Sequence, residues 1–486
     1  MKKKGQGVEY DSVEDQYFSE RGLRRYAGVW SLWALGVGAV ISGDFFGWNF
    51  GLRAGGFGGL FLATVIITAM YAGLCFSIAE MAAALPHTGG AYSFARSAMG
   101  PWGAYITGLA ENMEYILTPA VIVVGIGGYL GAIFGTPASV EPLWWLAAYA
   151  IFVGLNVAGV EITFRFTVLI TALALGVLVV FWVSAIPHFD MAWALNIEPS
   201  EGRTRWLPNG PGGILSALPF AIWFFLAIEQ LPLAAEEAHA PARDLPRGLL
   251  YGLLTLVIAA FLTLFLNAGI APGSGPLGSS AEPLFEGFKT TFGAGIGAKL
   301  LALVAVTGLV ASFHSIIFAY GRQIFSLSRA GYFPRWLSQT HHRRQTPHIA
   351  LLVGAALGYA VAFGIHSLGQ DHPVGAVLLN MAVFGAVIAY ALQMVSYILL
   401  RVRLPNIARP YRSPLGVPGA VLALVIALVT LVTLFVTDPV YRKVVIGAAI
   451  WYGLGLLWFA IYARRKLVMA PEETFALSAH GPQDDA

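Results

Sequence analysis

The chain has 486 residues, of which 57% are hydrophobic and only 11% are charged, with a formal net charge of +3. Soluble globular domains carry about 25% charged residues, so this composition excludes a soluble protein. Twelve stretches of at least 18 residues contain no Asp, Glu, Lys or Arg. Because a bilayer core of about 30 Å needs about 20 apolar residues of helix, the composition predicts a polytopic membrane protein.

The apolar stretches are long and unbroken, whereas the strands of a membrane β-barrel alternate over about ten residues. The spans are therefore predicted to be helices, and the fold class is an all-α membrane protein with twelve transmembrane helices. We place them at 27–54, 57–84, 100–134, 141–160, 164–186, 213–239, 246–270, 292–328, 348–368, 373–402, 415–437 and 441–463. The loops leave no room for an enzyme active site, so we expect no catalytic residues and no enzyme activity.

Basic residues are distributed unevenly between the two sides of the predicted bilayer. With the N-terminus inside, 22 of the 29 Lys and Arg residues fall in inner segments, which predicts that both termini are cytoplasmic and that the membrane is the inner one. The first 25 residues show no apolar signal-peptide region. The basic clusters at 335–344 and 401–412 lie just inside span ends, which favours lipid headgroups over nucleic acid as their partner.

The sequence lacks the motifs for ATP hydrolysis and for metal binding. There is no Walker motif, so ATP hydrolysis is not the expected energy source. The single cysteine, Cys75, lies in an apolar run and is read as core. No His and Cys spacing suggests a metal site, and we expect no cofactor.

Two of the predicted spans contain features that interrupt a helix. Span 1 carries Gly36, Gly38, Gly43, Gly47 and Gly51, with Ser42 and Asp44 in its middle. Each glycine costs about 1 kcal/mol in a helix relative to alanine. Span 6 has Glu229 and Gln230 at mid-span, followed by Pro232, a residue that suits the start of a new helical segment. These features predict breaks near 41–44 and 227–231.

A broken helix at the start of each five-span half is typical of an inverted-repeat transporter with its site at the midplane. We therefore expect a 5+5 inverted repeat with broken helices 1 and 6, followed by two additional helices. The expected parts are a cytoplasmic tail at 1–26, a transport core at 27–402 with repeats 27–186 and 213–402, helices 11–12 at 403–463, and a cytoplasmic tail at 464–486.

Three motifs resemble the amino acid, polyamine and organocation (APC) permease superfamily. They are GVGAVISGDFF at 36–46, AEM at 79–81 continuing through Pro86 to GGAY at 89–92, and AEE at 235–237 leading to PARDLP at 241–246. The family usually has a Gly, a small residue and a Gly where this chain has Ser42, Gly43 and Asp44. Within the superfamily, SGDFFGWN at 42–49 together with GLAENMEY at 108–115 is similar to the ethanolamine permeases.

The resemblance implies a set of substrate-binding residues. Family members that carry amino acids hold the substrate carboxylate on backbone N–H groups at the helix 1 break, and here Asp44 stands at that position. Its charge would repel a carboxylate and attract an ammonium group, although it is also able simply to cap the half-helix. The expected binding residues are Ile41, Ser42, Gly43, Asp44, Glu111, Glu114, Tyr115, Trp223, Ala227 and Glu229.

For the other expected binding residues we consider a functional role beside a structural one. Glu114 is expected to touch substrate or a coupling proton, or else to pair with a broken helix; such intramembrane carboxyl groups usually face a bundle interior. Trp223 offers a cation–π face to the substrate, or else belongs to packing or an interfacial belt. Glu229 is expected to organise the unwound backbone rather than to select the cargo.

The resulting hypothesis is a secondary active transporter that imports ethanolamine, a protonated small amino alcohol, by alternating access. The expected partners are the substrate, the lipid bilayer and a coupling ion, proton or sodium, with no nucleic acid. One alternative in the same superfamily is an amino acid or polyamine permease. An alternative of another class is an amine channel or sensor, although a channel needs a continuous polar pore and the ionisable residues here converge on one region.

Overall fold

The structure is a computed structural model that describes residues 3–14, 16–280, 282–293, 295–368, 374–436 and 440–479. Residues 1–2 and 480–486 of the predicted tails lie outside the described residues, as do residues 294, 373 and 437 of the predicted spans.

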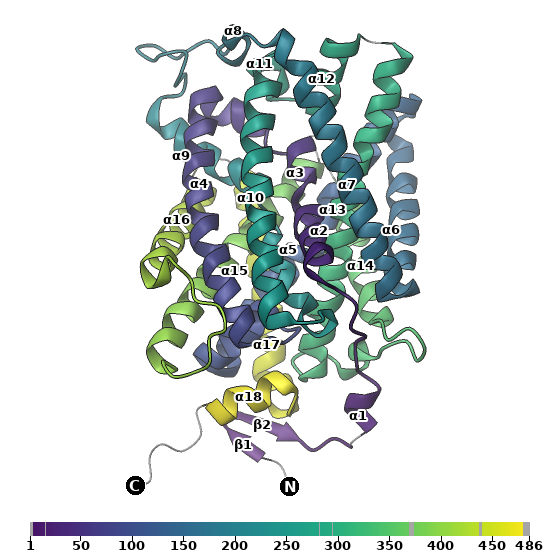
Figure 1. Cartoon of the computed structure of the whole chain (residues 1–486), viewed down its shortest axis with the longest axis vertical. Coiled ribbons are helices and arrows are strands. Elements are labelled where there is room, and N and C mark those ends of the chain that lie inside the picture. Colours follow the sequence, from purple (N-terminus) through teal and green to yellow (C-terminus); the bar gives the residue numbers. More distant parts are fainter. Residues whose placement is uncertain are drawn as a thin grey trace.

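The chain forms a bundle of long helices (Figure 1). Its first half contains α2 (Val29–Val40), α3 (Ser42–Phe45), α4 (Phe50–Ala84), α5 (Gly90–Phe134), α6 (Glu141–Ala158) and α7 (Val160–Ala185). Its second half contains α9 (Gly210–Ala221), the 3-10 helices η3 (Ile222–Phe224) and η4 (Ile228–Glu237), α10 (Pro241–Ala268), α13 (Ile296–Arg329), α14 (His348–Leu368) and α15 (Val374–Arg403). Two more long helices follow, α16 (Gly416–Val436) and α17 (Val440–Ile461).

Among the described residues, nine helical segments are long and apolar enough to cross a membrane, and two shorter apolar helices cover 29–45 and 348–364. The 34-residue helix α13 completes the twelve predicted spans. Two long helices bend where the sequence predicts separate elements. Gly56 in α4 and Gly100 in α5 have φ of 69° and 78°, a region that only glycine enters readily.

Helix 1 is interrupted, but the chain leaves helical geometry later than expected. Ile41 keeps helical angles and α3 continues to Phe45, whereas Phe46 is extended and Gly47 has φ of 99°. The hydrogen bonding is interrupted earlier, because the Ser42 N–H donates to Ser312 Oγ at 2.9 Å. The predicted break is therefore confirmed, with the extended backbone at 46–47 instead of 41–44.

Helix 6 is interrupted around Ala227, whose φ of 78° is left-handed. The second half that follows is a ten-residue 3-10 helix, η4, with Pro232 inside it. The expectation that Pro232 begins the new segment is wrong, since Ile228 does.

The long helices pack as two sets. One set consists of α4, on which α9 and α10 pack, together with α2 and η4, which pack on α10. The neighbouring set consists of α5, α15, α13, α14 and α7, and α2 also contacts α7 and α13. Large apolar side chains such as Leu454 and Val432 are exposed on α17 and α16, which suits a lipid-facing surface.

Both termini lie at one end of the bundle, here called the terminal end (Figure 1). A small sheet lies there, with the hairpin β1 (Lys3–Gly5) and β2 (Val8–Asp11) and a parallel partner β3 (Leu467–Val468). The sequence did not predict this sheet. Short helices complete the chain: α1 (Gln16–Ser19), η1 (Ala138–Val140), η2 (Ile186–His188), α8 (Met191–Ala194), α11 (Ser274–Leu277), α12 (Pro283–Phe292), η5 (Arg335–Ser338), η6 (Ala463–Arg465) and α18 (Pro471–Ala479).

Candidate functional site

A pair of carboxyl groups, Glu114 of α5 and Glu229 of η4, lies in the interior of the bundle. Their exposed fractions are 0% and 3%, and the hydroxyl of Tyr390 contacts both of them. Two neighbouring, buried carboxyl groups repel each other strongly when both are ionised, which favours a proton on one of them.

Three tyrosines surround this carboxyl pair. The Tyr115 hydroxyl donates to Glu229 at 3.2 Å. The Tyr390 hydroxyl lies 3.1 Å from Glu229 and 3.3 Å from Glu114, and the Tyr71 hydroxyl donates to Tyr390 at 3.0 Å. The carboxyl pair is thus connected to α4, α5 and α15 through one hydrogen-bonded chain.

The fold brings these side chains together through the helix 6 break and the packing of α5 on α15. Left-handed Ala227 redirects the backbone just before Glu229. Helix α5 carries Glu114 and Tyr115 and packs along α15, which carries Tyr390. With Tyr71 of α4, the cluster therefore depends on four elements that are distant in the sequence.

The helix 1 break forms a second part of the candidate site. Ser312 Oγ accepts from the Ser42 N–H and donates to the Gly38 carbonyl at 2.8 Å, so α13 supplies hydrogen bonds that the helix lacks. Gly43 lies against the backbone of Trp223, where an added Cβ would be 2.0 Å from the carbonyl oxygen. Only glycine permits this approach of the two broken helices.

Asp44 is fully buried beside this contact. Thr263 of α10 is its polar neighbour, but no donor among the described residues reaches either carboxylate oxygen at hydrogen-bond distance. Asp44 lies within the turn of α3 and makes no capping hydrogen bond. The reading of Asp44 as a helix cap is therefore wrong.

Glu111 is one turn of α5 away from Glu114 but has different contacts. Its carboxylate accepts from Gln323 Nε2 of α13 at 2.6 Å. Ala91 and Tyr92, in the first turn of α5 before the bend at Gly100, lie nearby. Glu111 thus links α5 to α13, and the structure does not place it in the cluster of the carboxyl pair.

The indole of Trp223 is 2% exposed and packs over Gly47, where an added Cβ would meet Nε1 at 2.1 Å. The interfacial-belt reading of Trp223 is therefore wrong, since the side chain is buried in the bundle interior. Ile41 is also fully buried, between α2 and α3.

Sequence reasoning did not select Tyr71, Tyr390 or Ser312 as site residues. Tyr390 lies in a charge-free apolar run, where a tyrosine hydroxyl needs a buried partner. A polar hydroxyl in an apolar span was therefore the sequence feature that could have pointed to Tyr390. The sequence does not show which group the hydroxyl binds, because that group lies on another helix.

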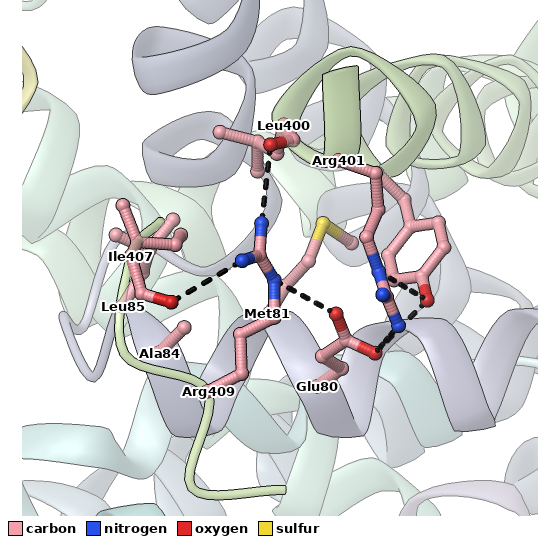
Figure 2. A pocket seen from close by; sticks show the side chains of 9 residues that line it. Glu80, Met81, Ala84, Leu85, Leu400, Arg401, Ile407 and Arg409 are labelled. Atoms are coloured by element: carbon pink, nitrogen blue, oxygen red, sulfur yellow. Dashed lines mark hydrogen bonds and ion pairs between the residues drawn. The ribbon is translucent and has the colours of Figure 1, made fainter. Parts of the chain in front are cut away.

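Glu80, in the AEM motif, belongs to a cluster of ion pairs outside the carboxyl pair (Figure 2). Its carboxylate binds Arg401 at 2.6 Å and Arg409 at 3.0 Å. It also accepts from the Tyr397 hydroxyl and the Ser413 N–H. This cluster joins α4 to α15 and its following loop, and its carboxylate is fully engaged.

Two further ion pairs join η4 to α13 towards the terminal end. Arg322 binds Glu237 at 2.7 Å with both side chains 0% exposed, and Arg329 binds Glu236 at 2.6 Å. Arg243, in the PARDLP motif, binds Asp244 of the same motif.

Comparison with known proteins identifies the family. The sequence matches the amino acid permease family over residues 32–471. An uncharacterized transporter of Rhizobium meliloti is 33% identical, over 71% of this chain and 76% of that protein. The branched-chain amino acid permease BcaP of Bacillus subtilis is 26% identical, over 92% and 94%.

A crystal structure of a mutant manganese transporter from Eremococcus coleocola has the same fold, with a TM-score of 0.56 and 15% identity, over 95% of this chain and 98% of that one. This likeness and the family match confirm the predicted twelve-helix architecture of the APC superfamily. The chain is therefore a multi-pass membrane transporter and not a member of an enzyme family. Because the match spans most of the sequence, the chain belongs to the amino acid permease family.

Proposed function

We propose that this protein is a secondary active transporter that imports protonated ethanolamine across the cytoplasmic membrane by alternating access. The terminal end is the cytoplasmic end, as the distribution of Lys and Arg predicts. The substrate-binding residues are those of the helix 1 break with Asp44 and those of the helix 6 break with Trp223, Ala227 and Glu229, together with Tyr115. Glu114, beside Glu229, holds the coupling proton, and Glu111 supports the site through its hydrogen bond to Gln323 of α13.

The observation that carries the proposal is the buried carboxylate of Asp44. Neither of its oxygens accepts a hydrogen bond from the described residues, and an ionised buried carboxylate is costly without a partner. An ammonium group supplies both charge and donors. A substrate carboxylate at the same break would instead be repelled, so a small amine without a carboxylate fits best.

The carboxyl pair supports a coupling role for a proton. Glu114 and Glu229 are both contacted by Tyr390 and lie on α5 and η4, which belong to different sets of helices. Movement of the sets relative to each other changes this contact and hence the affinity for the proton. We therefore favour the proton over sodium as the coupling ion.

The second candidate is an amino acid permease. Relatives of this chain include the branched-chain amino acid permease of Bacillus subtilis and a D-serine/D-alanine/glycine transporter of Escherichia coli. An amino acid has both an ammonium and a carboxylate, so this alternative requires a binding mode that keeps the carboxylate away from Asp44.

The test is uptake by the purified protein in liposomes, with pH and sodium gradients imposed separately. We expect saturable uptake of radiolabelled ethanolamine that a pH gradient, acid outside, accelerates. Unlabelled ethanolamine should compete, whereas serine, which adds a carboxylate to ethanolamine, should compete at least tenfold less well. Equal competition by serine would favour the second candidate, and flux that does not saturate would favour a channel.

A further inference from the structure

The C-terminal segment 467–479 is folded onto the terminal end of the bundle (Figure 1). Strand β3 pairs in parallel with β2 of the N-terminal hairpin. The Val468 N–H donates to the carbonyl of Ala330, just after α13. The two ends of the chain therefore meet on the bundle, and helix α18 begins directly after this contact.

Two consecutive glutamates in the first turn of α18 are inserted into the bundle end, each with an exposed fraction of 0%. The Glu472 carboxylate accepts from the Tyr92 hydroxyl and lies 3.4 Å from both the Ser326 hydroxyl and the Arg329 guanidinium. Its partners belong to α5 and α13. Glu472 is thus held by the two helices on which it lies.

Glu473 has its own set of partners. It binds Arg96 of α5 at 2.6 Å and accepts from the hydroxyls of Tyr10 and Tyr332 at 2.8 and 2.7 Å. Tyr10 is in β2, so this glutamate joins the C-terminal segment, the N-terminal hairpin and α5. Charged residues are rarely buried unless they are fully paired, and these two are.

The same network reaches the broken helix 6. Arg329, which contacts Glu472, also binds Glu236 at the end of η4 through both terminal nitrogens, at 2.6 and 2.8 Å. The Glu236 N–H donates to the hydroxyl of Thr88, in the turn between α4 and α5. On the same turn, the His87 ring lies 5.9 Å from the ring of Phe475 in α18.

We propose that residues 467–479, anchored by the N-terminal hairpin, form an autoinhibitory latch that holds the terminal end of the transporter closed. Opening at this end requires η4 to separate from α13, which breaks the Arg329–Glu236 pair. Glu472 holds the same guanidinium, and α18 lies across its partners on α5 and α13. The latch must therefore detach from α5 and α13 before this end opens.

This inference rests on the transport function of the family and is independent of the substrate. Any process that draws α18 away, such as a partner that binds the segment, would raise the fraction of molecules open at this end. The latch thus offers a means of regulating transport without changing the binding site.

The test measures access to the buried surface beneath the latch. Cys75, the single cysteine, is fully buried and is replaced by serine, and Ser326→Cys then provides a reporter directly under Glu472. In the full-length protein in liposomes or inside-out vesicles, a membrane-impermeant maleimide is applied from the side of the termini. The variant carries Glu472→Gln and Glu473→Gln, and the matched control carries Glu14→Gln and Glu20→Gln, two exposed glutamates at the same end.

We expect the latch variant to be labelled at least tenfold faster than the parent, and the control to match the parent. Equal labelling rates of latch variant and control would overturn the latch, as would rapid labelling of the parent. If the double variant fails to insert into the membrane, Glu472→Gln alone is tested by the same labelling assay. Faster labelling than in the control supports the latch, and an equal rate overturns it. Because no substrate is needed, a failure of the ethanolamine proposal leaves this result unaffected.

Discussion

Asp44 and Glu114 are both buried carboxyl groups, but their surroundings differ. Glu114 accepts a hydrogen bond from Tyr390, which also contacts Glu229. Asp44 has Thr263 beside it and no hydrogen bond to its oxygens from the described residues. In the proposed function, the first arrangement holds the coupling proton and the second binds the ammonium group of the substrate. Substitutions at the two positions should therefore have different effects.

Asp44→Asn should weaken the apparent affinity for ethanolamine at least tenfold, which is about 1.4 kcal/mol, because charge-assisted hydrogen bonds contribute about 1.5–3 kcal/mol. Its thermal stability should be unchanged or higher, since an unpartnered buried charge is removed. Uptake kinetics and thermal unfolding in detergent measure the two effects. Asp190→Asn, an exposed residue that caps α8, is the control. Unchanged affinity in Asp44→Asn would remove Asp44 from the binding site.

Tyr390→Phe should uncouple uptake from the pH gradient, because it deletes the hydroxyl that contacts both members of the carboxyl pair. It should also lower the free energy of unfolding by about 1–3 kcal/mol, the effect of leaving buried polar groups without a partner. Tyr149→Phe is a matched control, since that buried hydroxyl has no hydrogen-bond partner among the described residues. If both variants respond alike to the pH gradient, the tyrosine chain has no coupling role.

Glu114→Gln separates recognition from coupling at the same cluster. Glutamine keeps the shape of the side chain but cannot share a proton with Glu229 as a carboxyl group does. We expect uptake driven by the pH gradient to fall at least tenfold, whereas exchange of ethanolamine across the membrane without a gradient persists. A selective loss of binding, measured by calorimetry, would instead assign Glu114 to substrate recognition.

At the scale of elements, the two broken helices depend on each other. Helix 1 approaches helix 6 so closely that the Gly43 Cα lies against the Trp223 carbonyl, and the Gly47 backbone lies against the Trp223 indole. Ser312 of α13 satisfies the hydrogen bonds that open in helix 1. The interruption is therefore maintained by its neighbours as well as by its own glycines.

Gly43→Ala should be severely destabilising, because the new Cβ would lie 2.0 Å from a backbone oxygen that cannot rotate away. Overpacking a core typically costs about 1–3 kcal/mol, and we expect the upper end of this range together with loss of uptake. Gly176→Ala in α7 is the control, since a Cβ there meets nothing within 4 Å. Thermal unfolding compares the two, and an equally mild effect would show that helix 1 can move away from helix 6.

At the scale of the whole molecule, the two sets of helices meet at the terminal end through charged pairs. Arg322–Glu237 is fully buried between α13 and η4, and Arg329–Glu236 lies beside it. The latch adds Glu472 to the second pair. These charged contacts therefore help to hold the two sets of helices together at this end.

Glu237→Gln should lower the free energy of unfolding by about 3–5 kcal/mol, the effect of leaving one buried charge without its partner. Glu161→Gln breaks the exposed Arg165–Glu161 pair on α7, and its effect should stay below about 1 kcal/mol. Replacing both buried partners by apolar residues, Arg322→Met with Glu237→Leu, should recover much of the loss. Equal effects of the two single substitutions would mean that the buried pair does not hold this end together.

The sequence by itself determined the membrane class, the twelve spans and the positions of most of their ends. Long charge-free runs admit few structures other than helices in lipid, and the bends at Gly56 and Gly100 coincide with the predicted ends of spans. Glycines and polar residues at mid-span also located both breaks to within a few residues. These features depend only on residues that are close together along the chain, so the sequence alone predicts them.

Only the tertiary structure decided which groups are partners. The Glu114–Glu229 pair with Tyr71 and Tyr390, the Ser312 bridge and the absence of a cap at Asp44 all depend on contacts between distant helices. The insertion of Glu472 and Glu473 into the bundle end does so too. In a membrane interior each polar group is satisfied by whichever helix lies opposite, and side-chain spacing along one helix does not specify that neighbour.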